Sequence, residues 1–213
     1  MKTDELIETL GVTVDRVEDR SFRSAFVVAL IVGAALAVCA MQAALGISAS
    51  SLRESHPGLL ILIAVFVIGL VAAGSTYLLR AAYPAMGVRG PTALIVLLMA
   101  AFLCAGVAGL LAVDPAAWSS MLFGPRWTIC LACIPLFAIG PFIALMWVLR
   151  KGAPTRLRPT GAVAGLVAGA IGAGACALHM PGGSLPFIAL WYAGPILLCA
   201  LLGALLAPRL LRW

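Results

Sequence analysis

Charged residues are scarce in this sequence. Lys, Arg, Asp and Glu make up 10% of the 213 residues, against about a quarter in a typical soluble domain, whereas 63% are hydrophobic. With only 14 basic and 8 acidic side chains, the chain cannot cover the surface of a globular core of this length. The apolar fraction excludes a disordered chain, and 6 cysteines are too dilute for a disulfide mini-protein. The composition therefore predicts a membrane protein.

Six uncharged stretches are long enough to cross a bilayer. A hydrocarbon core about 30 Å thick requires about 20 apolar residues in a helix. These stretches are residues 24–45, 59–79, 91–113, 127–149, 160–178 and 187–208. We therefore predict an all-α fold, a polytopic bundle of six transmembrane helices over residues 24–213, preceded by an N-terminal segment over residues 1–23.

The basic residues are divided unequally between the two sides of such a bundle. Twelve of the 14 lie in the N-terminal segment, the second and fourth connections and the tail, whereas Arg53 and Arg126 lie in the remaining connections. By the positive-inside rule we predict that both termini are cytoplasmic. The net charge of +6 thus reflects membrane topology and does not predict binding to nucleic acid.

The N-terminal segment, residues 1–23, holds six of the eight acidic residues. Its apolar residues recur at helical spacing on one face, and they are Leu6, Ile7, Leu10, Val14 and Val17. Helices that lie on membranes usually carry basic residues on their polar face, whereas this polar face is mainly acidic. We therefore predict that the segment binds a protein partner.

Cysteines and a histidine mark one end of the predicted bundle. Cys130 and Cys133 form a C-x-x-C motif in the first turns of the fourth span, and the fifth span leads to His179 and Met180. An imidazole, a thioether and thiols at one level are able to bind a soft metal ion such as Cu(I) or Cd(II), or to sense oxidants. The alternative interpretations of the C-x-x-C are a disulfide redox site or two small residues on one helical face.

Small residues within the spans predict close helix packing. Gly161, Gly165 and Gly169 share one face of the fifth span, where they favour close contact either with a helix of the same chain or with a second copy. We expect Cys104 and Cys199, both near the middle of a span, to be core packing residues. Because the spans contain no Lys, Arg, Asp or Glu, a transporter is disfavoured.

Motifs along essentially the whole chain resemble the NrsF family. They are residues 1–7 (MKTDELI), the run Cys130-Leu131 through Ile134-Pro135, the loop 149–156 (LRKGAPTR), residues 189–192 (ALWY) and the ending 209–213 (RLLRW). Members of this family are membrane-embedded anti-sigma factors of bacteria, the negative regulators of sigma F.

The resemblance implies a signalling function without enzyme activity. The N-terminal segment would hold an extracytoplasmic-function sigma factor at the bacterial inner membrane, and heavy-metal or oxidative stress would release it. The implied partners are this sigma factor and membrane lipid, without direct contact to nucleic acid. No cofactor is implied beyond a transient soft metal ion, and the oligomeric state stays open. The alternative functions are a membrane thiol-disulfide oxidoreductase using Cys130 and Cys133, and a small transporter.

One position departs from the family pattern. That pattern has a cysteine at the position of Cys130 and a second one directly after the histidine of the fifth loop, where this chain has Met180. A thioether forms no disulfide. Either Cys133 or Cys176 supplies the second thiol, or Cys130, His179 and Met180 bind a soft metal, or the sensing function has been lost or altered.

Overall fold

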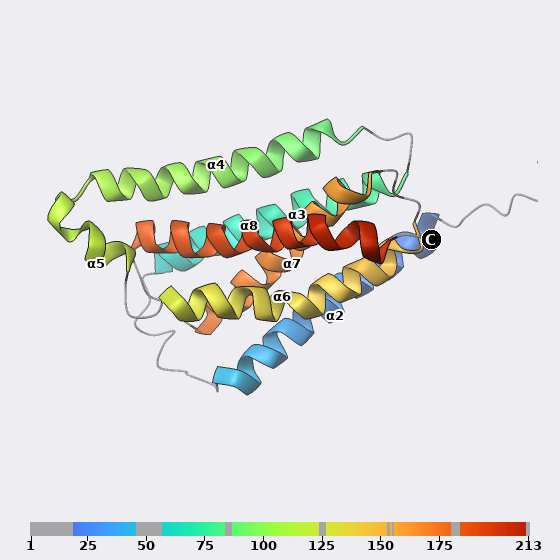
Figure 1. Cartoon of the computed structure of the whole chain (residues 1–213), viewed down its shortest axis with the longest axis horizontal. Helices are drawn as coiled ribbons and strands as arrows, with labels where there is room; N and C mark the ends of the chain where they lie inside the picture. The colour runs from blue at the N-terminus through green and yellow to red at the C-terminus, as the bar shows by residue number, and fades with distance from the viewer. Residues whose placement is uncertain are drawn as a thin grey trace, which may run out of the picture.

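A computed structural model describes residues 19–45, 57–83, 87–123, 127–152, 154, 156–179 and 184–211. The regular secondary structure of these residues is entirely helical. The elements in chain order are α2 (Asp19–Leu45), α3 (Pro57–Ala81), α4 (Arg89–Leu111), the 3-10 turn η1 (Pro115–Ala117), α5 (Trp118–Leu122), α6 (Trp127–Leu149), α7 (Leu157–His179) and α8 (Leu185–Leu210), as Figure 1 shows.

Six of these helices are long and apolar enough to cross a membrane, which confirms for the described residues an all-α fold with six helices compatible with membrane spans. The observed ends differ from the predicted ends by at most three residues. The predicted spans stopped at the first charged residue, whereas most of the observed helices continue through basic residues such as Arg80, Arg89 and Arg158. Long basic side chains extend from a helix end to the membrane surface, so the helix continues beyond its uncharged part.

The two described ends of the chain, Asp19 and Leu211, lie at the same end of the bundle (Figure 1). The connections from α3 to α4 and from α6 to α7 also lie there, and we term this the basic end because it includes Arg80, Arg89 and Arg150. The opposite end, where α6 begins and α7 ends, is termed the cysteine end. The assignment of the basic end to the cytoplasm stays a prediction.

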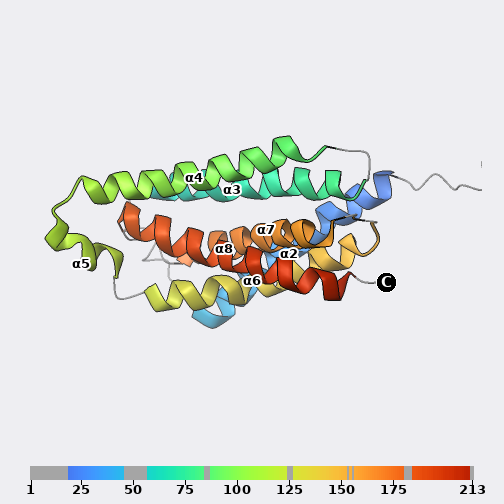
Figure 2. The same ribbon diagram turned by 45° about the horizontal axis from the view of Figure 1, so that its top comes forward.

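Helix α7 is the central helix of the bundle. In its most apolar 18-residue stretch 72% of the residues are buried, against 22–44% in the other five spans. It contacts α2, α3, α6 and α8, and in Figure 2 it lies between α3 above and α6 below. Its many glycine and alanine residues allow this position, because small side chains let four neighbouring helices approach at once.

The glycine face of α7 packs against α8. A Cβ atom at Gly165 would overlap the carbonyl oxygen of Cys199, and one at Gly169 would lie 3.2 Å from the Cα atom of Ile196. A Cβ atom at Gly161 would overlap Ala207 and Gly203 in the same way. The three predicted packing glycines thus lie in a contact within one chain.

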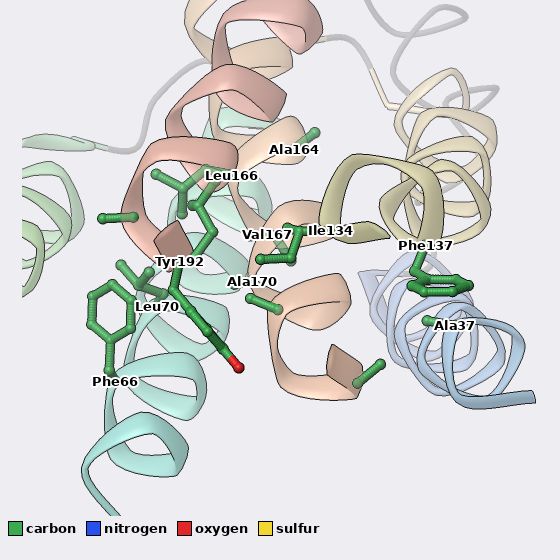
Figure 3. Packing of buried hydrophobic residues seen from close by; sticks show 14 of the residues in the cluster. Ala37, Phe66, Leu70, Ile134, Phe137, Ala164, Leu166, Val167, Ala170 and Tyr192 are labelled. Carbon is green, nitrogen blue, oxygen red and sulfur yellow. The ribbon is translucent and has the colours of Figure 1, made fainter. Parts of the chain in front are cut away.

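The remaining core joins side chains from several helices around α7 (Figure 3). Phe66 of α3 stacks on Phe102 of α4 with 3.8 Å between the ring centroids, whereas Val167 of α7 and Tyr192 of α8 are buried near the centre. Because nearly all of these buried side chains are apolar, the described helices are held together mainly by side-chain packing.

The two cysteines near the middle of spans differ in their surroundings. Cys199 is buried against α6 and α7, but Cys104 on α4 is exposed at the surface of the bundle. The prediction that Cys104 packs in the core is therefore wrong. Depth in the membrane does not determine which side of a helix faces the protein, because an apolar side chain is equally compatible with lipid.

Candidate functional site

Three cysteines come together at the cysteine end. Cys130 in the first turn of α6 and Cys176 in the last turn of α7 are 2% and 0% exposed. Their side chains are joined by a hydrogen bond. Cys133, one turn further along α6, is half-buried and lies close enough to interact electrostatically with both. We term these three residues the thiol cluster.

Local packing explains how the thiol cluster forms. Residues three apart on a helix share a face, so Cys130 and Cys133 both point toward the same neighbour. Gly172 lies one turn before Cys176, and a Cβ atom there would be 2.6 Å from the carbonyl oxygen of Ile134. The absence of a side chain at Gly172 thus lets α7 approach the backbone of α6 and places Cys176 beside Cys130.

A tyrosine from the last helix borders the thiol cluster. Tyr192 of α8 is 2% exposed and interacts electrostatically with Cys176 and Cys130. Its ring belongs to the buried core shown in Figure 3. The cluster is therefore enclosed by α6, α7 and α8.

Aromatic rings form a second layer at this end. The ring centroids of Trp127 and Trp191 are 4.9 Å apart, and Phe123 lies edge-on to both at 6.0 and 6.1 Å. Trp127 is one turn before Cys130, and Trp191 directly precedes Tyr192. These three aromatic residues contact one another next to the thiol cluster.

Helix α5 is an element that the sequence interpretation missed. The indole N–H of Trp191 donates a 2.7 Å hydrogen bond to the Leu122 carbonyl oxygen, and the Ser184 hydroxyl donates one of 3.1 Å to the Met121 carbonyl oxygen. These bonds fasten α5 to the start of α8. The signal for a helical turn was present in Asp114-Pro115, because Asp is a common N-cap and Pro is favoured in the first turn.

The other predicted site residues are only partly described. His179 ends α7 at the cysteine end, and its backbone alone is described. Met180 lies outside the described residues, as do the predicted partner-binding residues Leu6, Ile7, Leu10, Val14 and Val17. Of the predicted sensing residues, the structure therefore brings together Cys130 and Cys133, and it adds Cys176.

In the part of the chain that the structure describes, no group of three or more His, Cys, Asp or Glu side chains is arranged to hold a metal ion. A resident structural zinc ion usually has four protein ligands. The hydrogen-bonded pair Cys130 and Cys176 instead offers two thiols, a set that suits transient binding of a soft cation or oxidation to a disulfide.

The helices and the thiol cluster define the class as a polytopic α-helical membrane protein with a cysteine site at one end. A family model described as "Negative regulator of sigma F" matches residues 10–213. The chain belongs to this family, NrsF, as its motifs indicated.

Two curated relatives are similar to this chain. "Probable anti-sigma-F factor NrsF" from Azospira oryzae is 32% identical over 219 residues, which cover 100% of both chains. "Anti-sigma-F factor NrsF" from Caulobacter vibrioides is 37% identical over 101 residues, which cover 47% of each chain. No solved structure matches.

Membership of this family gives the chain a regulatory role as an anti-sigma factor, for which the partner class is a sigma factor. It favours regulation over the oxidoreductase and transporter alternatives. The same membership agrees with the six apolar helices of a multi-pass membrane protein.

Proposed function

We propose that this protein holds an extracytoplasmic-function sigma factor at the bacterial inner membrane and releases it under heavy-metal or oxidative stress. The N-terminal segment binds the sigma factor, and the thiol cluster senses the stress. The hydrogen bond between Cys130 and Cys176 is the observation that supports the sensing step, because it joins two different helices at one chemically reactive point. The concentration of basic residues at the basic end supports a cytoplasmic position for the sigma-binding segment.

Oxidation at this pair has a balanced chemical course. A peroxide oxidises the Cys130 sulfur to a sulfenic acid and is itself reduced to water or an alcohol. The Cys176 sulfur then attacks the sulfenic acid, the S–O bond breaks, and a disulfide and water form. The two thiols thus supply the two electrons that the peroxide accepts, and their two protons leave in the oxygen-containing products.

A soft metal ion would act on the same pair. Binding of Cd(II) by two cysteine sulfurs displaces their protons, because the thiolate is the ligand. His179 and Met180 follow Cys176 in sequence and are the proposed additional ligands. Either stress therefore replaces a hydrogen bond between α6 and α7 by a stronger link, and the disulfide also brings the two sulfurs closer together.

Helix α7 is the proposed route from the thiol cluster to the sigma-binding segment. It contacts α2, whose first residues (19–23) belong to that segment, and α2 also packs on α6. At the contact with α6, a Cβ atom on Gly33 would lie 2.8 Å from the Cα atom of Pro141, so a movement of α6 relative to α7 has to move α2 as well. Release then requires that the sigma factor binds one of the two bundle arrangements more tightly than the other.

Binding of the sigma factor is tested with the full chain in phospholipid nanodiscs. Leu10→Asp places a charge on the apolar face of the N-terminal segment, and Thr9→Asp places the same charge outside that face. We expect the first variant to lose retention of the co-expressed sigma factor and the second to keep it. Equal retention by both variants, or no retention by the unmodified chain, would contradict the proposal.

A further inference from the structure

A groove runs along the surface of the bundle between α6 and α8. At the basic end it has a volume of about 450 Å³, and its lining includes Ile143, Met146, Trp147, Leu206 and Leu210. It continues toward the middle of the bundle as a hollow of about 100 Å³ that shares some of the same lining residues. The larger part falls within the range of roughly 300–1,000 Å³ that is usual for ligand sites.

Small residues line the inner hollow of the groove. Gly165 and Ala168 of α7 line the inner hollow, and Gly203 lines it from α8. Gly165 and Gly203 lie in the close contact between α7 and α8, so this contact borders the hollow. The outer walls of the groove are apolar, with Ile143 62% and Trp147 60% exposed.

Two cations are held at the mouth of the groove. The Arg150 Nε–H donates a 2.7 Å hydrogen bond to the carbonyl oxygen of Leu210, which fixes this guanidinium between the ends of α6 and α8. The Lys151 ammonium lies 4.0 Å from the centre of the Trp147 ring. Both residues are exposed, as is Arg209 in the neighbouring turn of α8.

No acidic side chain offsets these cations within the described part of the basic end. Asp114 follows α4 and therefore lies toward the cysteine end, and only the backbone of Asp19 is described. The groove thus combines apolar walls inside the membrane with positive charge at its surface. This is the distribution of chemistry along an anionic phospholipid, whose apolar chains end in a negatively charged phosphate group.

We propose that the groove between α6 and α8 is a binding site for an anionic phospholipid. One acyl chain lies against Ile143, Trp147 and Leu206, and the phosphate group lies beside Arg150 and Lys151. Arginine suits this position because its planar guanidinium forms paired hydrogen bonds to phosphate oxygens. The site is independent of the sigma-binding segment, and the lipid links the ends of two helices that already meet at Arg150 and Leu210.

Brominated lipids test the site in the full chain. The protein is reconstituted in phosphatidylcholine vesicles that contain either phosphatidylglycerol or phosphatidylcholine brominated in the acyl chains, and tryptophan quenching is measured. The contribution of Trp147 is obtained by subtracting the signal of Trp147→Phe. We expect brominated phosphatidylglycerol to quench Trp147 at a several-fold lower mole fraction than brominated phosphatidylcholine.

Charge and shape variants separate the site from ordinary lipid contact. Arg150→Gln and Lys151→Gln should each lower the preference for phosphatidylglycerol over phosphatidylcholine roughly fivefold. This is the factor expected for one basic residue near an anionic surface. Leu206→Phe fills the groove and should lower quenching while both cations remain. Arg89→Gln, at the start of α4, is the control that should keep the preference, and circular dichroism verifies that each variant is folded.

Three results would overturn the assignment. The first is equal quenching by the two brominated lipids. The second is a preference for phosphatidylglycerol that survives in the Arg150→Gln and Lys151→Gln double variant. The third is a preference that emerges only after residues 1–18 are removed, since the acidic N-terminal segment would then be the occupant of the groove in the full chain.

Discussion

Cys130 and Cys176 are separated by 46 positions in the sequence and meet because α6 and α7 reverse direction at the basic end. At the scale of single residues, their hydrogen bond is the feature that distinguishes the thiol cluster from other cysteines in the chain. Cys199 is also buried, but its environment is the contact between α7 and α8 at another level of the bundle. The three buried cysteines thus differ in their chemical neighbours.

We predict that Cys176→Ser abolishes induction by peroxide and leaves repression intact. Serine has nearly the same size as cysteine, but its hydroxyl cannot form a disulfide. Transcription from a sigma-dependent promoter is the measurement, and induction should fall to the level of untreated cells. Cys199→Ser is the matched control and should respond as the unmodified chain does.

A further comparison identifies the second thiol. If Cys133→Ser loses induction while Cys176→Ser keeps it, the switch belongs to the C-x-x-C motif and the proposed pair is wrong. In the Cys176→Ser background, Met180→Cys restores the family pattern and should restore induction. Mass spectrometry of the peroxide-treated protein should detect the Cys130–Cys176 linkage directly.

At the scale of helices, the position of α7 depends on residues that have almost no side chain. Gly165 contacts the backbone of Cys199, and Gly172 contacts that of Ile134, so two points on one side of α7, two turns apart, touch two different helices. Pro135 and Pro141 lie inside α6 and remove backbone donors from that helix. Helix α6 is therefore less constrained by its own hydrogen bonds than a helix without proline.

Gly165→Ala is predicted to destabilise the bundle by about 1–3 kcal/mol or more, the usual cost of overpacking. The added methyl group would overlap the carbonyl oxygen of Cys199 and force α7 and α8 apart. Unfolding in mixed micelles, followed by circular dichroism, measures the change in free energy of unfolding. Gly194→Ala on α8 has no neighbouring atom within 4 Å and should leave stability unchanged or slightly increased. Equal effects of the two substitutions would show that the close contact at Gly165 is unimportant.

The sequence predicted the helices better than it predicted their contacts. Long uncharged stretches identify spans because a bilayer requires about 20 apolar residues. The rotation of each helix about its axis is less determined, because α7 is apolar on every side and gives no polar face to orient it. For this reason the pairing of Cys130 with Cys133 followed from spacing, but the choice of Cys176 as the hydrogen-bonded partner required the structure. Helix α5 was missed because five residues give no periodic pattern.

At the scale of the whole molecule, the separation of charge and thiols gives the bundle two chemically different ends. Arg150 and Lys151 lie at the basic end, whereas Cys130 and Cys176 lie at the other. A signal received at the cysteine end therefore has to cross the length of the bundle to affect a partner at the basic end. The central helix α7 spans that distance and contacts four of the other five long helices.

The orientation in the membrane is predicted from the excess of basic residues. In a cysteine-free background, Ser119→Cys at the cysteine end should react with a membrane-impermeant maleimide in intact spheroplasts. Gly87→Cys at the basic end should react only after lysis. Both positions are exposed, so a difference in labelling reports the side of the membrane. The reverse labelling pattern would invert the topology and place the N-terminal segment outside the cytoplasm.

The enclosure of the thiol cluster limits which oxidants can reach its buried sulfurs. Cys130 and Cys176 are almost completely covered, with Tyr192 beside them and the rings of Trp127 and Trp191 nearby. A large disulfide such as oxidised glutathione cannot approach either sulfur without opening the bundle, whereas hydrogen peroxide is little larger than water. If the thiol cluster senses oxidants as proposed, steric access as well as the chemistry of sulfur would set which oxidants it detects.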